Sequence, residues 1–430
     1  MGKKAQSLSK PLENRKGKLY FDGVSAIELA EKFDTPLYVI SESRIRENYK
    51  RLNKALTRNY EKTRVYYAAK ANSNLSVLKI LETVGAHLDT VSPGEISMGL
   101  ATSFPPERIL FTGTSVRNDE LRFLADSNVT VNIDSLSQLE RLLKMKVPDV
   151  LSVRINPEIG AGHHDHCITA GKQSKFGLWE DDALKAYATA KKKGVTRFGI
   201  HMHIGSGVLK VEPFVLALDK LLGIAKKVHD KIGIRFEFVS MGGGLGVPYA
   251  PEDKELDLTV FSDEVLSLFK SRIDKYDLGK PFFCVEPGRY LICDASVLLT
   301  AVNTVKVTPF NKFVGVDAGF NTLVRPTMYG SYHHVLVANK LDSPEKETYD
   351  VVGPVCESGD VLAKERRLPK IEEGDLLVIL NAGDYGFAMS SQYNARPRAA
   401  EVLVKNGNCV LVREREQLDD LMSGQRRAEC

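Results

Sequence analysis

The sequence predicts an α/β protein built as a (β/α)8 TIM-like barrel with a C-terminal all-β domain. Eight short apolar runs recur along the first part of the chain, with amphipathic segments between them. After Arg289 the sequence becomes rich in β-forming residues and poor in helix signals. A length of 430 residues is too great for one small core, so two domains are expected.

The eight apolar runs are the predicted barrel strands: 65–69, 87–90, 109–112, 129–133, 151–155, 198–203, 236–240 and 282–286. The segments between them place Leu, Val, Ile or Ala at helical spacing and charges on the other face, as in 75–85, 134–145, 180–194 and 214–233. Such alternation implies parallel strands joined by crossover helices, and eight units fit a closed barrel. An open doubly wound sheet fits the alternation too. No G-x-G-x-x-G follows the first run, which disfavours its dinucleotide-binding form.

The part of the chain after Arg289 is predicted to be an all-β domain. Its apolar runs include 400–414, where Asn406-Gly407 is a hairpin turn signal. Apolar runs near the N-terminus could belong to the same domain, which would make it discontinuous in sequence. The expected boundaries are a barrel over 36–289, a β domain over 290–418 with an N-terminal strand from 17–35, and flexible tails over 1–16 and 419–430.

Composition restricts the partners and the compartment. The formal charge of +4 is small for this length, and no basic stripe with interleaved aromatic residues occurs, so nucleic acid is not an expected partner. No apolar stretch approaches the length that crosses a membrane, so no membrane association is expected. The six cysteines are sparse and contain no C-x-x-C pair, which favours reduced thiols and a cytoplasmic protein.

Residues able to do chemistry follow several of the predicted strands. Lys70 follows the first, His201 and His203 end the sixth, Gly242, Gly243 and Gly244 follow the seventh, and Glu286, Gly288 and Arg289 end or follow the eighth. In a barrel, the C-terminal ends of the strands gather at one mouth, where the active site lies. The sequence therefore predicts that these residues converge.

Each residue also has a structural interpretation when it is taken alone. A single lysine usually extends to solvent with its stem on an apolar surface. A glycine triplet is often a tight turn, Glu286 could form an ion pair at a strand end, and His203 could be structural.

Taken together, the groups favour a cofactor site. The glycine backbone, with Arg289 and Ser206, would bind a phosphate, and Glu286 would keep a pyridine nitrogen protonated. Lys70 would be the nucleophile, with His203 against the ring. This set describes pyridoxal phosphate.

Two alternatives compete with this interpretation. His201 and His203 share one strand face and could be metal ligands, and "GHHDHC" over 162–167 contains several ligand types. A metal role leaves Lys70 and the glycine triplet unexplained, so no metal is expected. The second alternative is a protein with the same pyridoxal-phosphate fold that has lost catalysis and acts only as a binding protein. The presence of Lys70 and Cys356 disfavours this alternative.

Six segments together resemble the fold-type III decarboxylases that use pyridoxal phosphate, and within them the diaminopimelate decarboxylases: "YYAAKAN", "HMHIGSG", "GGGLG", "EPGRY", "GPVCESGD" and "YGFAMSSQYNARPRAAEVL". The resemblance runs from about residue 20 to about residue 415. It implies a cofactor-binding barrel, a C-terminal β domain and a homodimer with shared active sites. The implied reaction is the decarboxylation of meso-2,6-diaminopimelate to L-lysine and CO2, the last step of lysine biosynthesis.

The resemblance also implies residue roles. Lys70 corresponds to the Schiff-base lysine, and Cys356 to a proton donor supplied by the second subunit. The expected catalytic residues are Lys70, Cys356 and His203. The expected cofactor contacts are Lys70, His203, Ser206, Gly243, Gly244, Glu286, Gly288, Arg289 and Tyr385. The expected substrate contacts are Arg289, Arg325, Tyr329, Glu357 and Tyr385.

The chemistry of the substrate agrees with the narrower resemblance. Diaminopimelate has a carboxylate and an ammonium group at its far end, and Arg325 with Glu357 would supply partners of both signs. A related basic or carboxy-amine substrate, of the ornithine, arginine or carboxynorspermidine type, is the alternative. Two residues depart from the family pattern: Gly207, where many relatives have glutamine, and Asp384, where alanine is common.

Overall fold

The computed structural model describes residue 8 and the ranges 10–162 and 169–428. The chain divides into two compact units. One unit, called here the barrel unit, comprises Arg46–Pro248 and Lys254–Leu291. The other, called the β unit, comprises the described residues up to Ile45, the segment Tyr249–Asp253 and the described residues from Ile292 onward.

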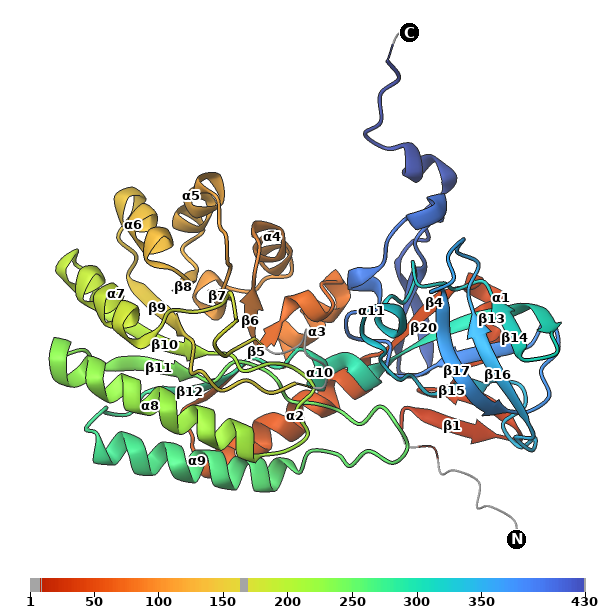
Figure 1. Cartoon of the computed structure of the whole chain (residues 1–430), viewed down its shortest axis with the longest axis horizontal. Helices are drawn as coiled ribbons and strands as arrows, with labels where there is room; N and C mark the ends of the chain where they lie inside the picture. The colour runs from red at the N-terminus through yellow and green to blue at the C-terminus, as the bar shows by residue number, and fades with distance from the viewer. Residues whose placement is uncertain (1–7, 9, 163–168, 429–430) are drawn as a thin grey trace. The chain divides into compact units, whose positions relative to one another are not determined.

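Eight parallel strands close the barrel, which confirms the predicted fold class. The last strand pairs with the first, with Val285 opposite Val65. Most strand residues are buried, as expected for a closed barrel whose interior is filled by side chains. Helices cover the outside of the barrel (Figure 1). The strands are β5 (Thr63–Ala68), β6 (His87–Thr90), β7 (Ile109–Phe111), β8 (Thr130–Ile133), β9 (Val150–Ile155), β10 (Arg197–Met202), β11 (Phe236–Ser240) and β12 (Phe282–Val285).

Several helices of the barrel begin at polar caps, and they bury an apolar face. Asn74 caps α3 by accepting from the Ser76 N–H, and Ser135 caps α6 by accepting from the Gln138 N–H. Gly233 ends α8 in the left-handed conformation, with φ 68°. The helices are α2 (Glu42–Asn59), α3 (Leu75–Thr83), α4 (Pro93–Ala101), α5 (Asn118–Ser127), α6 (Leu136–Met145), α7 (Glu180–Lys192), α8 (Glu212–Ile232), α9 (Leu258–Lys275) and α10 (Arg289–Ile292).

Tyr66, Leu110, Phe238 and Cys284 form a buried cluster inside the barrel. The Phe238 ring lies against the backbone of Gly199, where a Cβ atom would come within 2.1 Å of it. A glycine at this strand position therefore leaves the room that a large aromatic ring needs in the interior.

Nine strands form the main sheet of the β unit, in the order β17-β16-β14-β13-β4-β19-β20, with β18 pairing with β13 and β15. The strands are β4 (Leu37–Ser41), β13 (Ser296–Val307), β14 (Lys312–Val316), β15 (Val335–Val337), β16 (Glu347–Val352), β17 (Val361–Leu368), β18 (Leu376–Ile379), β19 (Ala400–Lys405) and β20 (Asn408–Arg413). The unit also has helices α1 (Ala26–Phe33) and α11 (Arg325–Tyr329).

Two N-terminal segments differ from the expected domain boundaries. Strand β4 starts just after the expected barrel boundary at residue 36, yet it lies in the β unit because it pairs with both β13 and β19. Leu12–Arg15 falls in the expected tail but forms β1, which pairs with β2 (Lys18–Phe21); β3 (Val24–Ser25) completes a small three-stranded sheet.

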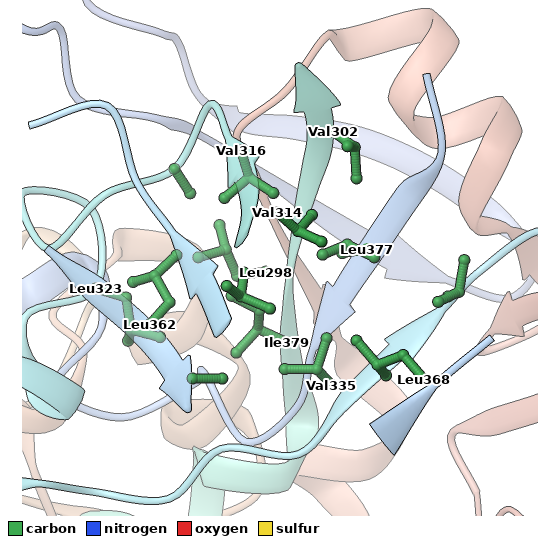
Figure 2. Packing of buried hydrophobic residues seen from close by; sticks show 14 of the residues in the cluster. Leu298, Val302, Val314, Val316, Leu323, Val335, Leu362, Leu368, Leu377 and Ile379 are labelled. Atoms are coloured by element: carbon green, nitrogen blue, oxygen red, sulfur yellow. The ribbon is translucent and has the colours of Figure 1, made fainter. Parts of the chain in front are cut away.

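The core of the β unit contains aliphatic side chains from several strands. Figure 2 shows Leu298, Val314 and Ile379 among the side chains that meet there. A second cluster includes Val39 and Val402, so alternate residues of the central strands are buried in two cores. Because both faces of these strands are buried, their sequences are nearly continuous apolar runs.

The hairpin signal in the sequence matches the local backbone. Asn406 and Gly407 have φ values of 51° and 73°, and they join β19 to β20. Positive φ at both central residues is the requirement of the tight hairpin turn that Asn-Gly favours. Among the helices of the described ranges, none has the length and apolarity needed to cross a membrane.

Candidate active site

Lys70 lies directly beyond the C-terminal end of β5, in a short 3-10 turn over Ala69–Ala71. Its side chain is 40% exposed, and its Nζ lies 3.5 Å from Asp89 Oδ2. The amine therefore sits at the barrel mouth, partly open to solvent, with a carboxylate beside it. This position is the one at which barrel enzymes place reacting groups.

Asp89, on β6, is a buried acid that faces Lys70. Burial raises the pKa of Asp89 to about 7, although the Lys70 ammonium opposes the rise. Its Oδ1 atom is buried and has no hydrogen-bond partner among the described residues. A carboxyl that titrates near neutrality beside an amine can exchange a proton with its surroundings.

Glu286 follows β12 and is held by two side chains, one from β10 and one from β11. His201 Nε2 lies 2.9 Å from Glu286 Oε2, and Ser240 Oγ donates to Glu286 Oε1 at 2.6 Å. Burial would raise the pKa of Glu286, but His201 and the Ser240 hydroxyl outweigh it and lower the pKa. The structure therefore keeps a buried carboxylate ionised at the barrel mouth.

His203 lies one residue beyond β10 and accepts a hydrogen bond. The Gly243 N–H donates to His203 Nδ1 at 3.0 Å. Burial, followed by the charges of Lys70 and Arg154, lowers the pKa of His203 well below its usual value. The ring is therefore neutral near pH 7, and its proton lies on Nε2 because Nδ1 accepts.

The glycine triplet packs so closely that larger residues would displace the backbone. A Cβ atom at Gly242 would lie 2.4 Å from the Met202 carbonyl oxygen, and one at Gly243 would lie 2.3 Å from the Glu286 carbonyl oxygen. At Gly244, φ is 108°, a conformation that other residues rarely adopt. The turn thus brings bare backbone next to His203 and Glu286.

Arg289 and Ser206 complete this side of the mouth. Arg289 is buried, and its Nε and Nη2 atoms donate to Ser206 Oγ at 3.4 and 3.3 Å. Gly288 precedes Arg289, and its carbonyl accepts from the Leu291 N–H. The structure thus brings a buried guanidinium and a hydroxyl together at the same end of the barrel as the glycine turn.

The remaining expected residues belong to the β unit. Arg325 is 1% exposed, and its Nη1 donates to Tyr249 Oη at 2.7 Å while Nη2 donates to Ser331 Oγ at 3.3 Å. Its guanidinium carbon also lies 4.9 Å from the centre of the Tyr249 ring. Tyr329 ends the same short helix and is half-buried.

Cys356 and Glu357 are exposed on the loop between β16 and β17. The Cys356 N–H donates to Asn394 Oδ1 at 2.6 Å, which holds the backbone of this loop. Tyr385 is half-buried and has a φ of 53°, which is strained for a tyrosine. Asp384, next to it, is fully buried and lies 3.3 Å from Tyr249 Oη.

The two histidines of the metal alternative have other contacts, because His201 pairs with Glu286 and His203 with the Gly243 N–H. In the ranges that the structure describes, no group of three or more His, Cys, Asp or Glu side chains could hold a metal ion. Most of the "GHHDHC" segment, residues 163–167, lies outside the described residues.

Sequence reasoning missed three charged or polar members of this site. Asp89, Arg154 and Ser240 lie within the predicted strands, where their apolar neighbours dominate the pattern. Arg154 is buried and lies 4.5 Å from the centre of the Phe176 ring. For Asp89 and Arg154, the charge inside a barrel strand is itself the signal that could have identified them, since charged residues are rarely buried without a partner. Ser240 gives no comparable signal.

The side chains present fit pyridoxal phosphate. Buried Arg289 with the Ser206 hydroxyl suits a phosphate, and ionised Glu286 suits a protonated ring nitrogen. The partly exposed Lys70 amine suits attachment to an aldehyde. The buried Oδ1 of Asp89, which has no protein partner among the described residues, offers a further polar contact.

Comparison with known proteins agrees with this chemistry. The model of the pyridoxal-dependent decarboxylases, pyridoxal binding domain, matches residues 42–293. The diaminopimelate decarboxylase of Methanothermobacter thermautotrophicus is 55% identical over 96% of both chains, and that of Archaeoglobus fulgidus is 41% identical over 96% of this chain and 98% of its own.

Solved structures give the same result. The diaminopimelate decarboxylase of Methanocaldococcus jannaschii in complex with L-lysine has a TM-score of 0.90 and 35% identity, over 97% of this chain and 98% of its own. The lysine/ornithine decarboxylase of Vibrio vulnificus, with a TM-score of 0.76 and 22% identity over 89% and 98% of the two chains, shares the fold. The chain therefore belongs to the diaminopimelate decarboxylase family of pyridoxal-dependent decarboxylases.

Proposed function

We propose that this enzyme decarboxylates meso-2,6-diaminopimelate to L-lysine and CO2 with pyridoxal phosphate as its cofactor. One observation carries the proposal: Lys70, ionised Glu286, neutral His203 and the Arg289–Ser206 pair all lie at the C-terminal end of one barrel. The near-full-length relatives named for this reaction support the choice of substrate.

The cofactor, when bound, supplies an electron sink for the electron pair left behind by CO2. Glu286 would hold a proton on the ring nitrogen, which strengthens this sink, and His201 and Ser240 keep Glu286 ionised for that task. His203 would lie against the ring as a neutral group, so it adds no charge there. Ser206 and Arg289, with Gly243, Gly244 and Gly288 beside them, would hold the phosphate.

For the substrate we assign Arg289, Arg325, Tyr329, Glu357 and Tyr385. Arg325 would bind the far carboxylate and Glu357 the far ammonium, because diaminopimelate presents both charges at that end. Arg325 is held by Tyr249 in the β unit, so its guanidinium is already oriented. When the substrate binds, Arg325 would exchange some of its present hydrogen bonds for contacts with the far carboxylate.

We further propose a homodimer in which each active site is shared. Cys356 of one subunit would return a proton to the carbon that loses CO2, completing the balance of the reaction. Exposed Cys356, on a loop whose backbone is held by Asn394, is available for such a contact. We also propose a cytoplasmic location, where thiols stay reduced; cell fractionation tests it.

The first test identifies the attachment residue. Borohydride reduction of the loaded enzyme, followed by peptide mapping, should find the pyridoxyl group on Lys70. Lys70→Arg is the matched variant, because it keeps the charge and removes the reactive amine. A pyridoxyl group on any other lysine would overturn the assignment.

The second test identifies the substrate. CO2 release is measured with meso-diaminopimelate, lysine, ornithine, arginine and carboxynorspermidine, each with added pyridoxal phosphate. Diaminopimelate should give the highest kcat/KM. A higher value for any other member of the panel would replace diaminopimelate as the substrate, while leaving the Lys70 assignment intact.

A further inference from the structure

A cavity lies at the N-terminal end of the barrel strands, whereas Lys70 follows the C-terminal end of β5. It has a volume of about 370 Å³. Its walls include Arg64, His87 and Val150, which lie at or next to the first residues of β5, β6 and β9. The volume is at the lower end of the range for small-molecule pockets.

Arg64 offers this cavity a fixed, uncompensated positive charge. Its guanidinium carbon lies 3.7 Å from the centre of the Phe282 ring, which orients the group. In the described part of the chain no carboxylate forms an ion pair with it. By contrast, Arg197 on the same cavity is paired with Glu237 through two hydrogen bonds of 2.7 and 2.8 Å.

His87 presents an unused polar atom beside Arg64. Its Nδ1 is buried and forms no hydrogen bond with any described residue, and its ring lies 4.7 Å from that of Tyr66. Burial, with the charges of Arg64 and Arg108, lowers the pKa of His87 to about 3, so the ring is neutral near pH 7. A neutral imidazole can place its proton on Nδ1 and donate to an anion. An unsatisfied buried polar atom costs free energy unless a ligand or water meets it.

The rest of the lining suits an organic molecule. Leu124, Val129, Leu142 and Phe238 contribute buried apolar surface, and Phe238 belongs to the cluster inside the barrel. Three acidic residues also line the cavity: Glu107 and Asp149 are exposed, and half-buried Glu237 is paired with Arg197. A planar carboxylate matches the guanidinium fork, and the apolar wall would cover the body of the ligand.

We propose that this cavity is a binding site for a small organic carboxylate, held by Arg64 and His87 and distinct from the active site. The proposal is independent of the substrate assigned above. It predicts that binding depends on negative charge and on Arg64, and that it does not depend on occupation of the active site.

The test is calorimetric titration of the loaded enzyme with benzoate, and with benzamide as the uncharged molecule of the same shape. Benzoate should bind saturably, and benzamide at least about tenfold more weakly, because a charge-assisted hydrogen bond is lost. Arg64→Met keeps a contact with Phe282, and it should lower the affinity for benzoate at least about tenfold. The double variant Arg197→Met/Glu237→Gln is the matched control, because it removes the cation together with its paired carboxylate, and it should change the affinity by less than about twofold.

His87→Phe provides a second variant if Arg64→Met does not fold, and it should also lower the affinity for benzoate. Several outcomes would overturn the proposal: no saturable binding to the wild-type enzyme, equal binding of benzamide, or binding that both variants leave unchanged. Binding of inorganic phosphate in preference to benzoate would also overturn the carboxylate class. So would purely competitive inhibition of decarboxylation by benzoate, since that would place benzoate in the active site.

Discussion

At the scale of single residues, neighbouring groups determine the protonation of the buried carboxyls near the C-terminal ends of the barrel strands. Glu286 stays ionised in a buried place because His201 and Ser240 meet its two oxygens. Asp89, without a second partner among the described residues, is pushed toward neutrality instead. Two buried carboxyls on one barrel thus have opposite shifts in pKa, as acid–base sites require.

Removing the Ser240 hydroxyl should disturb Glu286 selectively. In Ser240→Ala the carboxylate loses a donor, so its pKa rises and the acid limb of the kcat/KM profile moves to higher pH. Cofactor affinity should fall about tenfold, as expected for a lost hydrogen bond to a charged group. Absorbance titration with pyridoxal phosphate and a pH series measure both effects.

The matched control for this prediction is Ser152→Ala. Ser152 is also fully buried on a barrel strand, but its hydroxyl has no hydrogen-bond partner among the described residues. It should leave the pH profile and the cofactor affinity unchanged. Equal shifts in both variants would show that Ser240 acts through packing alone.

His87 should make the protein less stable in acid. Its pKa of about 3 lies below the 6.5 of an ordinary histidine, so the unfolded chain binds the proton more readily. The contribution of His87 to the free energy of unfolding is therefore fully present above about pH 6.5, and it is lost as the pH decreases toward 3. Between about pH 7.5 and about pH 5, His87→Asn should lose about 2 kcal/mol less free energy of unfolding than the wild type. Urea denaturation at the two pH values measures this, and equal losses would contradict it.

At the scale of elements, the turn after β11 requires glycine at position 243, because a side chain there has no room. A Cβ atom at Gly243 would meet the backbone carbonyl of Glu286, which cannot rotate away. Gly243→Ala should therefore move the turn, lower the melting temperature and reduce the affinity for pyridoxal phosphate at least about tenfold. Absorbance titration measures the affinity.

Gly223→Ala is the control for the glycine turn. Gly223 lies in α8 with nothing within 4 Å of the position of a Cβ atom. Alanine there should raise the free energy of unfolding by about 0.5–1 kcal/mol and leave cofactor binding unchanged. A Gly243→Ala enzyme that binds the cofactor as the wild type does would contradict the role given to this turn.

The sequence alone predicted the elements that have strong local signals. The eight barrel strands were identified because both of their faces are buried, which makes them apolar runs bounded by polar residues. Strand β17 forms no continuous apolar run in the sequence, because Lys364, Glu365 and Arg366 interrupt its pattern where the strand is more exposed. Asp89 and Arg154 were missed because apolar neighbours concealed them. The contact of Tyr249 with Arg325 joins distant parts of the sequence, and no local pattern encodes it.

At the scale of the whole molecule, the proposed shared site makes a prediction from symmetry. Lys70→Ala and Cys356→Ala should each be nearly inactive as pure homodimers. In a mixed dimer one site receives both defects and the other receives neither. With equal amounts and random exchange, half of the dimers are mixed, so about a quarter of the wild-type site activity should return.

The experiment is to dissociate the two variants together, reassociate them and measure CO2 release. Subunit exchange is confirmed with differently tagged chains. A mixture that stays as inactive as its parents after confirmed exchange would show that Cys356 acts within its own chain or is not the proton donor.

The position of β4 in the middle of the β-unit sheet constrains how the chain can fold during synthesis. Leu37 pairs with Leu299 on one side and with Ala400 on the other, so the first long strand to leave the ribosome has partners that are made much later. The barrel unit between them is nearly continuous in sequence and can form first. Until β13 and β19 emerge, β4 exposes both of its edges, which is a condition that favours aggregation. We expect a nascent chain that stops before residue 400 to need chaperone protection, even though its barrel is complete.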